Sequence, residues 1–550
     1  MDRGSSQGKS RRRLSLALSP PILVAAAGVL VVLYQWANAR PLWLDEQMIA
    51  LNLRDRGFAG LAGQLWLDQS APLGWLVLQR FVLLVLGPSE LALRAAPAAF
   101  GVATIAAALY IGQRWLTEAG STIFVLLCSF AQWISFYAIE LKSYSADTFF
   151  GLLLPALAVL AAGASRNAIL LWIVAAAIGH WFSLGALLVL PACYAVIAIS
   201  ARRHRELFGL LAAGAAVLAV SIGLQYLLSL RHTQANETLQ QYWQFAFPPA
   251  EAGLSGTVRW LYSQLEPFAL KPGGTARIAA FWISAGLGFA VASARLLGVT
   301  AGLVVASGFG LAALRMMPLY ERLSLWFVPA LYLGIAMFAD RAVWFLQKRP
   351  LKQPWMNLAA AGAIAAAVLP VCVDVVERGI QDVRTGRPRS TNHETDDRSA
   401  VAWLMRQRQP GDVLITTGHA LPAIWWYGGV PISDAGGRQF ADGGRILTAE
   451  YHESRRVCRG RELEEALDGR SRVQVYLGFV DQQPGFDDLL LERLSKFGTV
   501  TALRHFAGTS RAAVVDPAHA EGSNLFWEDA GKDTGTWLKG CIAVGQGYAW

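Results

Sequence analysis

Long apolar segments separated by short polar ones fill the first two thirds of the chain. A helix needs about 20 mostly apolar residues to cross about 30 Å of hydrocarbon, because it rises about 1.5 Å per residue. The pattern predicts about eleven membrane-spanning helices, at residues 14–36, 92–112, 120–138, 145–164, 168–185, 186–201, 207–229, 276–294, 297–313, 324–340 and 356–374.

Residues 40–91 break this pattern, because short apolar pieces alternate there with charged side chains. The apolar piece 73–86 has only about 14 residues and carries Arg80, which is too short and too polar for a span. We expect residues 40–91 to form an external loop with short helices at the membrane interface.

Basic residues fix the expected orientation. Three arginines, Arg11 to Arg13, precede the first apolar segment, so residues 1–13 should stay in the cytoplasm. With about eleven spans, each cytoplasmic joint carries basic residues, namely Arg114, Arg166, Arg202, Arg203, Arg205, Arg295, Arg341, Lys348, Arg349 and Lys352. Counting residues 73–86 as a span would move these residues outside, against the positive-inside rule. The C-terminal part of the chain is therefore expected outside, in the periplasm of a bacterial inner membrane.

The chain changes character after residue 374, where charge becomes dense and short helix and strand patterns alternate. Residues 375–397 are predicted to be a linker, and residues 398–550 a soluble α/β domain. Helices are predicted at 399–408, 421–427 and 487–496, and strands at 412–417, 472–479 and 512–515. The fold class is thus a mainly helical polytopic membrane protein in which residues 14–374 precede a small α/β domain.

Composition agrees with a membrane location. Of the 550 residues, 54% are hydrophobic and only 16% charged, and the net charge of +9 is explained by the basic cytoplasmic joints. We therefore expect no nucleic-acid partner. Cys128, Cys193 and Cys372 fall in apolar segments, whereas Cys458 and Cys541 lie in the external part, where a disulfide between them stays open.

Charged residues at the outer ends of the predicted spans are the strongest functional signal, because an ionisable group near hydrocarbon costs roughly 2.5 to 3.5 kcal/mol. They come from five separate places in the chain. These are Asp45 and Glu46 after the first span, Arg94, the group Glu140, Lys142 and Tyr144, His180, and the group Tyr320, Glu321 and Arg322. Their convergence on one membrane face predicts a site at the outer interface.

The same motifs resemble a known family. The sequence Leu44-Asp45-Glu46, the later Ala71-Pro72-Leu73, Leu93-Arg94, the Glu140-x-Lys142-x-Tyr144 motif and Glu321-Arg322-Leu323 with Pro329 are similar, in this order, to those of GT-C membrane glycosyltransferases. The similarity is to the branch of protein mannosyltransferases and aminoarabinose transferases with their bacterial homologues. It covers about residues 20–340.

The resemblance implies transfer of a sugar from a polyprenyl-phosphate donor to a lipid, glycan or protein acceptor at the periplasmic face, with inversion at the anomeric carbon. The acceptor hydroxyl must lose a proton as it attacks, so a carboxylate is needed, and Asp45 is the expected general base with Glu46 beside it. Arg94, Lys142 and Arg322 are expected to neutralise the leaving phosphate together with Tyr144.

Glu140, Tyr320 and His180 are expected to contact the substrate. No nucleotide is expected as a cofactor. Some relatives bind a divalent cation beside the catalytic acid, but no set of ligands here has diagnostic spacing, so such a cation stays open.

Two departures from the family stand out. Ala71-Pro72-Leu73 lacks the basic or histidine residue and the second proline that relatives often have, and Lys142 replaces an arginine. Lysine still binds phosphate as a point charge, with less directionality than arginine.

Each motif also has a purely structural interpretation. Asp45 and Glu46 could cap a helix, Lys142 and Arg94 could anchor helix ends at the interface, and His180 could be packed against its neighbours. For the whole chain, a transporter or flippase of lipid-linked sugars and a membrane scaffold stay as alternatives. A transporter would carry charges at mid-membrane in repeated halves, whereas here they lie at one face.

Overall fold

The structure is a computed structural model, and it describes residues 19–292, 295–348, 353–385, 395–432, 437–452, 461–467, 471–479, 485–517 and 541–545. The chain divides into two compact units. The helical unit comprises Met1–Ala39 and Phe58–Pro388, and the sheet unit comprises Arg40–Gly57 and Arg389–Trp550.

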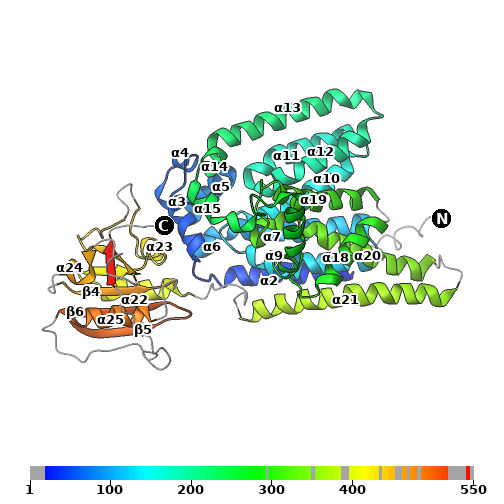
Figure 1. Cartoon of the computed structure of the whole chain (residues 1–550). Helices are drawn as coiled ribbons and strands as arrows, with labels where there is room; N and C mark the ends of the chain where they lie inside the picture. The colour runs from blue at the N-terminus through cyan, green and yellow to red at the C-terminus, as the bar shows by residue number, and fades with distance from the viewer. Residues whose placement is uncertain are drawn as a thin grey trace, which may run out of the picture. The chain divides into compact units, whose positions relative to one another are not determined.

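Long apolar helices build the helical unit (Figure 1). They are α2 (Pro20–Ala37), α7 (Ala95–Trp115), α8 (Glu118–Phe130), α10 (Tyr144–Ala161), α11 (Arg166–Phe182), α12 (Leu184–Ala201), α13 (Phe208–Gln225), α18 (Ile278–Val291), α19 (Arg295–Ala313), α20 (Val328–Lys348) and α21 (Pro354–Thr385). Many large apolar side chains stay exposed, including Val220, Leu227 and Leu369. Such a surface suits lipid, not water, and the chain is a multi-pass membrane protein.

The predicted spans all coincide with apolar helices of this unit. In the described part of the chain, eight helices are long and apolar enough to cross a membrane. The predicted spans 120–138, 168–185 and 276–294 are the shorter helices α8, α11 and α18. The segment 120–138 is broken, because α8 ends at Phe130 and α9 (Gln132–Tyr137) begins after Ala131. Residues 73–86, which we did not count as a span, form the apolar helix α5 (Leu73–Leu86).

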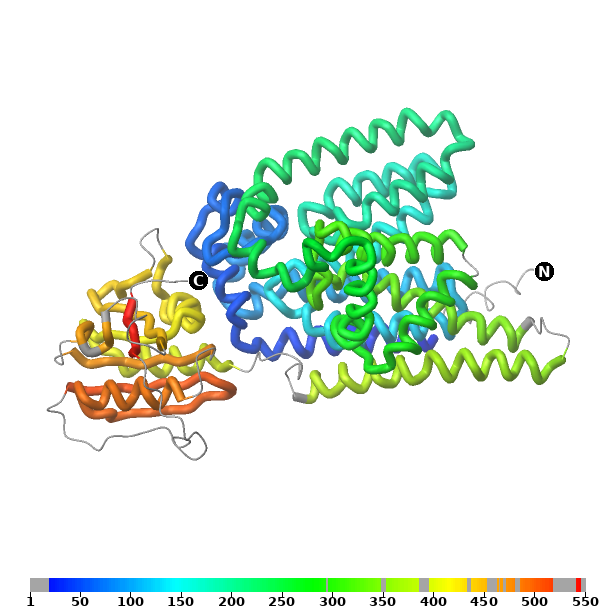
Figure 2. The backbone as a smooth tube through the Cα atoms, viewed as in Figure 1, coloured from blue at the N-terminus to red at the C-terminus, as the bar shows by residue number. Residues whose placement is uncertain are grey.

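Consecutive helices alternate in direction, as Figure 2 shows from α10 to α13. Short connections join α7 to α8, α10 to α11 and α11 to α12, and such connections make neighbouring helices antiparallel. The alternation puts residues 131–143, 226–277 and 314–321 at one end of the unit, which we call the site end. Arg114, Arg166 and Arg295 lie at the opposite end.

Short helices gather at the site end. They are α4 (Phe58–Leu61), α5, α6 (Glu90–Leu93), α9, the π-helix η2 (Tyr226–Leu230), α14 (Arg231–Gln234), α15 (Glu237–Tyr242), α16 (Gly253–Ser263), α17 (Leu265–Leu270) and the 3-10 helices η3 (Gln244–Ala246) and η4 (Glu321–Phe327). One further 3-10 helix, η1 (Arg205–Leu207), precedes α13 at the opposite end.

Close backbone packing fixes η4 against α10 and α12. A Cβ at Gly151 would overlap the backbone carbonyl of Trp326, and one at Gly185 would overlap its side chain. The carboxylate of Asp147 on α10 accepts hydrogen bonds from Ser183 Oγ at 2.7 Å and Gly185 N at 2.9 Å, which ties α10 to the start of α12. The end of η4 is thereby held against the middle of α10 and the start of α12.

The sheet unit has a seven-stranded sheet with the order β3-β7-β2-β1-β4-β6-β5. Its strands are β1 (Val413–Thr416), β2 (Ile446–His452), β3 (Arg461–Glu462), β4 (Val473–Leu477), β5 (Gly498–His505), β6 (Arg511–Pro517) and β7 (Cys541–Gly545). The central strand β1 pairs in parallel with β2 and β4, and the outer strands are antiparallel.

Alternation along the strands sorts the helices into two layers. Val413, Ile415 and Val475 pack in one core with α25 (Phe486–Leu494) and α24 (Leu463–Ala466). On the other face, Gln474 Nε2 donates to Leu404 O of α22 (Asp397–Gln407) at 2.9 Å. Both α23 (Leu421–Tyr427) and α3 (Leu44–Asp55) belong to this unit as well. The predicted α/β domain is confirmed, although the sequence pattern missed β2, β3, β5 and β7.

Domain boundaries differ from the expected ones in two places. Residues 40–57 of the predicted external loop belong to the sheet unit, because α3 is bonded to it, as described below. Helix α21 continues to Thr385, so the first part of the predicted linker is helical, and residues 386–394 lie outside the described residues. Cys541 is disulfide-bonded, whereas Cys458 lies outside the described residues.

The packing of η4 predicts that alanine destabilises the protein at Gly151 but not at Gly310. Gly151→Ala should lower the free energy of unfolding by about 1 to 3 kcal/mol, because the new methyl group overpacks against Trp326. Gly310→Ala on α19 is the control, since a Cβ there meets no atom within 4 Å. Thermal unfolding of the detergent-solubilised chain measures both, and equal unfolding temperatures would contradict the packing.

Candidate active site

Tyr137 lies near three of the charged residues predicted at the outer interface. Arg322, Glu140, Tyr144 and Glu321 all act electrostatically on its phenol. Its ring makes a T-shaped contact with that of Tyr144, with centroids 5.0 Å apart. The structure therefore brings the motif of residues 140–144 together with the motif of residues 320–322.

Lys271 adds a cation that the sequence motifs did not indicate. Its Nζ lies 3.4 Å from Glu321 Oε1 and 5.9 Å from the ring centroid of Trp133. Trp133 in turn stacks on Tyr137, with centroids 5.6 Å apart. Lys271 thus joins the same group of residues from a third segment of the chain.

The loop that carries Lys271 is held by two helices. Thr275 Oγ1 donates to Asp374 Oδ2 on α21 at 2.8 Å, and the hydroxyl of Tyr332 on α20 donates to Gly273 O at 3.1 Å. A fixed backbone limits the positions that the lysine side chain can take. The cation is therefore positioned by its surroundings before any ligand arrives.

Arg322 and Tyr320 lie in an aromatic environment. The guanidinium carbon of Arg322 is 5.6 Å from the ring centroid of Trp243, which is itself 5.5 Å from that of Tyr320. Burial raises the pKa of the Tyr320 phenol above its ordinary value of 10.0. Tyr320 therefore keeps its proton at neutral pH and can act as a hydrogen-bond donor.

A large cavity opens beside these residues. It encloses about 1080 Å³ of empty space, part of it open to solvent, and Lys271, Tyr320 and Glu321 line one part of it. Phe245, Phe268 and Leu319 are among the apolar side chains that line the rest. The cavity therefore combines charged groups with apolar walls, as a ligand with a charged head and an apolar body requires.

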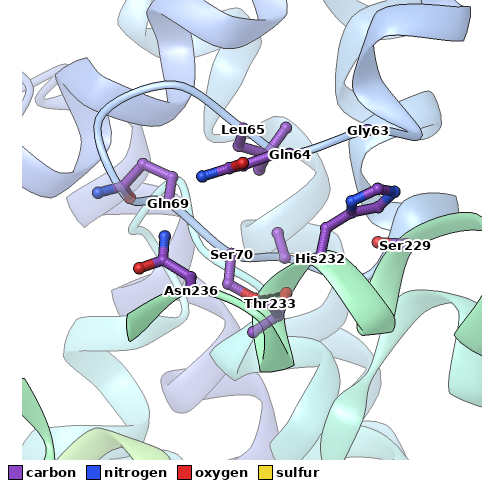
Figure 3. Close-up of a pocket in the computed structure, with 10 residues that line it drawn as sticks. Gly63, Gln64, Leu65, Gln69, Ser70, Ser229, His232, Thr233 and Asn236 are labelled. Atoms are coloured by element: carbon purple, nitrogen blue, oxygen red, sulfur yellow. Dashed lines mark hydrogen bonds between the residues drawn. The ribbon is translucent and has the colours of Figure 1, made fainter. Parts of the chain in front are cut away.

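Lys142 is buried and is held by the loop of residues 62–72. Its Nζ donates to Gln69 Oε1 at 2.6 Å. Figure 3 shows this loop facing the segment of residues 229–236, where Ser70 and Thr233 share a hydrogen bond of 2.9 Å. A pocket of about 260 Å³, counted out to open solvent, lies between the loop and this segment. Lys142 is thus connected to the loop of residues 62–72.

Arg94 lies at the junction where α6 ends and α7 begins, and only 1% of its surface is exposed. It belongs to the site end of the unit.

His180 lies in a separate network between α11 and α13. Its Nδ1 is 2.5 Å from Gln225 Oε1, and its Nε2 is 2.8 Å from Ser221 Oγ. Both ring nitrogens thus have partners within the helical unit. The hydrogen bonds of His180 are therefore explained by packing within the helical unit, without a substrate.

Asp45 and Glu46 lie on α3, in the sheet unit. Glu46 is fully buried and its Oε2 accepts a hydrogen bond from Trp43 N at 2.9 Å, which is a helix-capping contact. Asp45 lies in the same first turn and is partly exposed. The capping interpretation therefore applies to Glu46, whereas Asp45 reaches the surface.

Helix α3 is bonded to the C-terminal part of the sheet unit near both of its ends. Near its start, Gln47 Nε2 donates to Asp397 Oδ2 at 2.8 Å. At its end, Arg54 donates to Trp425 O at 2.8 Å and to Val430 O at 2.7 Å. These contacts explain why a helix from residues 40–57 folds with a domain that lies hundreds of residues later.

Asp397 is the buried centre of the first contact. Burial raises the pKa of its carboxyl above the ordinary value of 3.8, while hydrogen bonds from Tyr476, Gln47 and Ser510 act in the opposite direction. Ser510 Oγ lies 2.9 Å from Asp397 Oδ1. The carboxyl group therefore costs more to ionise in the folded protein than in the unfolded chain.

Sequence reasoning missed several residues of the cluster, namely Lys271, Trp133, Tyr137, Trp243 and Gln69. Four of them are aromatic or uncharged and carry no motif. Lys271 lies between two predicted spans, on the side predicted to be external, and this position was the one available signal. Among the described residues, no group of three or more His, Cys, Asp or Glu side chains is arranged to hold a metal ion.

Comparison with known proteins gives a structural likeness only. No family model and no curated protein matches the chain by sequence. The crystal structure of ArnT from Cupriavidus metallidurans in the apo state aligns with a TM-score of 0.50 and 12% identity, over 90% of this chain and 97% of that one. The same protein bound to undecaprenyl phosphate aligns with a TM-score of 0.49 and 13% identity, over the same shares.

The chain has the GT-C fold. At 12% identity, the likeness extends to the arrangement of helices and not to individual side chains. In this GT-C fold, the cluster around Tyr137 belongs to the helical unit alone, and Asp45 belongs to the sheet unit.

The buried Asp397 predicts a pH dependence of stability. Because its folded pKa is raised, the folded state holds a proton that the unfolded chain has lost, so the free energy of unfolding falls as pH rises from 3.8 through the raised value. The side chain in Asp397→Asn does not titrate. The unfolding temperature of this variant relative to that of wild type should therefore rise as pH increases across this interval. Thermal unfolding of the full chain between about pH 4 and pH 8 tests this.

The neighbouring Asp396→Asn is the matched control, because Asp396 caps α22 through Ser399 N and asparagine also caps helices. Parallel pH profiles for wild type and Asp397→Asn would contradict the assignment.

Proposed function

We propose that the chain is an inverting glycosyltransferase that moves a sugar from a polyprenyl-phosphate donor to an acceptor at the periplasmic face of a bacterial inner membrane. The observation that carries the proposal is the group of Lys271, Arg322 and Tyr137 beside a large, mainly apolar cavity in a membrane-embedded helical unit. The GT-C fold supports the same class of reaction, since ArnT is an aminoarabinose transferase.

A polyprenyl phosphate fits this chemistry. Its phosphate carries negative charge, and the cations that meet at Tyr137 and Glu321 would neutralise it as the sugar leaves. Its isoprenoid chain needs an apolar surface, which Phe245, Phe268 and Leu319 supply in the cavity. A nucleotide sugar would leave these walls without a matching partner.

The reaction exchanges one bond at the anomeric carbon for another. The acceptor oxygen forms a bond to that carbon, the bond from the carbon to the phosphate oxygen breaks, and its electron pair stays on the phosphate. The acceptor proton goes to a carboxylate. We assign this role to Asp45, because it is partly exposed while the neighbouring Glu46 is engaged in the helix cap.

Orientation follows from the two ends of the helical unit. The site end is opposite to Arg114, Arg166 and Arg295, which the positive-inside rule assigns to the cytoplasm. The site end would then face the periplasm. Lys142, Arg94, Glu140 and Tyr144 are proposed to help bind the donor there.

Removal of the base predicts a loss of transfer. Asp45→Asn should lower the rate of sugar transfer by about 10²- to 10⁴-fold, because the acceptor proton has no base, while donor binding stays unchanged. Transfer is followed by mass spectrometry of envelope glycans and lipids in cells that carry the variant as their single copy. Glu118→Gln is the control, since Glu118 is also an acid in the first turn of a helix, at the opposite end of the helical unit. Wild-type transfer by Asp45→Asn would remove Asp45 from the mechanism.

The donor site predicts a selective loss of phosphate binding. Arg322→Gln should weaken binding of undecaprenyl phosphate to the full chain in nanodiscs by about tenfold or more, because a charge-assisted contact is lost. Arg341→Gln is the matched control, because Arg341 also lies over a tryptophan ring, 4.2 Å from the centroid of Trp344. Equal affinities of the two variants would argue against a donor phosphate at Arg322.

A further inference from the structure

The sheet unit has the topology that places ligands at the carboxyl ends of parallel strands. From β1 the chain moves to β2 on one side, and it later returns to β4 on the other side of β1. In open α/β sheets, ligands bind where the strand order reverses in this way. The relevant edge is formed here by the residues that follow β1 and β4.

Aromatic side chains meet at this edge. His419 follows β1 and Phe479 follows β4, and their ring centroids are 5.5 Å apart. Phe479 also makes a T-shaped contact at 5.2 Å with Trp43, the N-cap residue that precedes α3. All three rings are partly exposed. The edge thus presents apolar ring surface together with the polar ring atoms of tryptophan and histidine.

Two buried hydroxyls lie at the same end of β1, because Thr416 is its last residue and Thr417 follows it. In the described part of the chain, Thr416 Oγ1 and Thr417 Oγ1 have no hydrogen-bond partner, and at most 2% of either residue is exposed. A buried hydroxyl without a partner costs roughly 1 to 3 kcal/mol. Such a cost at the end of a central strand indicates a polar ligand.

The backbone at this edge is held firmly. Thr509 Oγ1 donates to Gly478 O at 2.6 Å. A Cβ at Gly478 would overlap the Tyr476 hydroxyl and would lie 3.1 Å from Asp397 Oδ1. Gly478 is therefore held on both sides, so the backbone that carries the Phe479 ring is rigid.

We propose that Trp43, His419, Phe479 and Thr417 form a binding site for a neutral saccharide at the carboxyl edge of the sheet, and that this saccharide belongs to the acceptor. Pyranose rings have apolar C–H faces that pack on aromatic rings and hydroxyls that need hydrogen-bonding groups, which is the combination found here. Trp43 caps α3 and lies two residues before Asp45, which is in the first turn of that helix. The role as acceptor site rests on the proposed function; the saccharide site itself does not.

Saturation-transfer NMR on the full chain in nanodiscs tests the site, with the methyl glycosides of glucose, galactose, mannose and N-acetylglucosamine as probes. At least one probe should bind saturably. Phe479→Ala should weaken that binding by about tenfold, because a stacking ring is removed. Phe506→Ala is the matched control, since Phe506 is a partly exposed ring of the same unit that pairs with Trp403 at 6.4 Å, and it should bind as wild type does.

Thr417→Val keeps the test valid if Phe479→Ala fails to fold. The change removes a buried hydroxyl that has no partner among the described residues, so thermal stability should be unchanged or higher while probe binding falls. Absence of saturable binding by every probe, or wild-type binding in both variants, would overturn the site. Competition by envelope glycolipid would assign a lipid-linked saccharide, and competition by envelope glycoprotein a protein-linked one.

The two proposals fail separately. Loss of transfer in Asp45→Asn without any saccharide binding would refute this site and leave the proposed function standing. Saccharide binding with unchanged transfer in Asp45→Asn would support this site and remove Asp45 from the proposed mechanism.

Discussion

The bilayer tolerates no unpaired backbone group and few charges, and this constraint shapes the whole helical unit. Backbone groups are satisfied within helices, so apolar side chains can face lipid. Charged and polar side chains collect at the ends of the helices, where Glu140, Lys142 and Arg322 lie. Because α7 to α13 alternate in direction, residues far apart in sequence reach the same end. The candidate site is thus assembled from segments that are distant in sequence and that end on the same side of the helical unit.

Glycine and aromatic residues fix the positions of η4 and of the cations at the site end. Gly151 and Gly185 let η4 approach the helices α10 and α12 closely enough to hold Glu321 near Tyr137. The rings of Trp133 and Trp243 then lie under Lys271 and Arg322 and limit where these cations can point. Apolar packing and electrostatics therefore act together at this end of the unit, since each cation is placed by a neighbouring ring.

Much of this could be predicted from the sequence, because hydrophobic length and basic joints report directly on membrane spans. The meeting of the motifs at residues 140–144 and 320–322 was also predictable, since both end on the same side. Lys271 and Gln69 were not, because their roles depend on loop conformations that no periodicity encodes. The capping role of Glu46 was weighed correctly as an alternative, but only the bond to Trp43 N assigns it. The membership of α3 in the sheet unit depends on pairings such as Gln47 with Asp397, 350 residues apart, and no local pattern reveals such a pairing.

That separation has a consequence for biosynthesis. Ribosomes add about 5 to 20 residues per second, so α3 emerges roughly 20 to 70 seconds before its partner residue Asp397 is made. During this interval Met48, Ile49 and Leu51, which are buried in the finished protein, lack the C-terminal part of the sheet unit. The nascent chain must therefore shelter this helix, through the membrane surface or a chaperone, until the last third of the polypeptide has been synthesised. A ribosome that stops early leaves a membrane protein in which residues 46–53 of α3, all buried in the complete chain, have lost the partners that bury them.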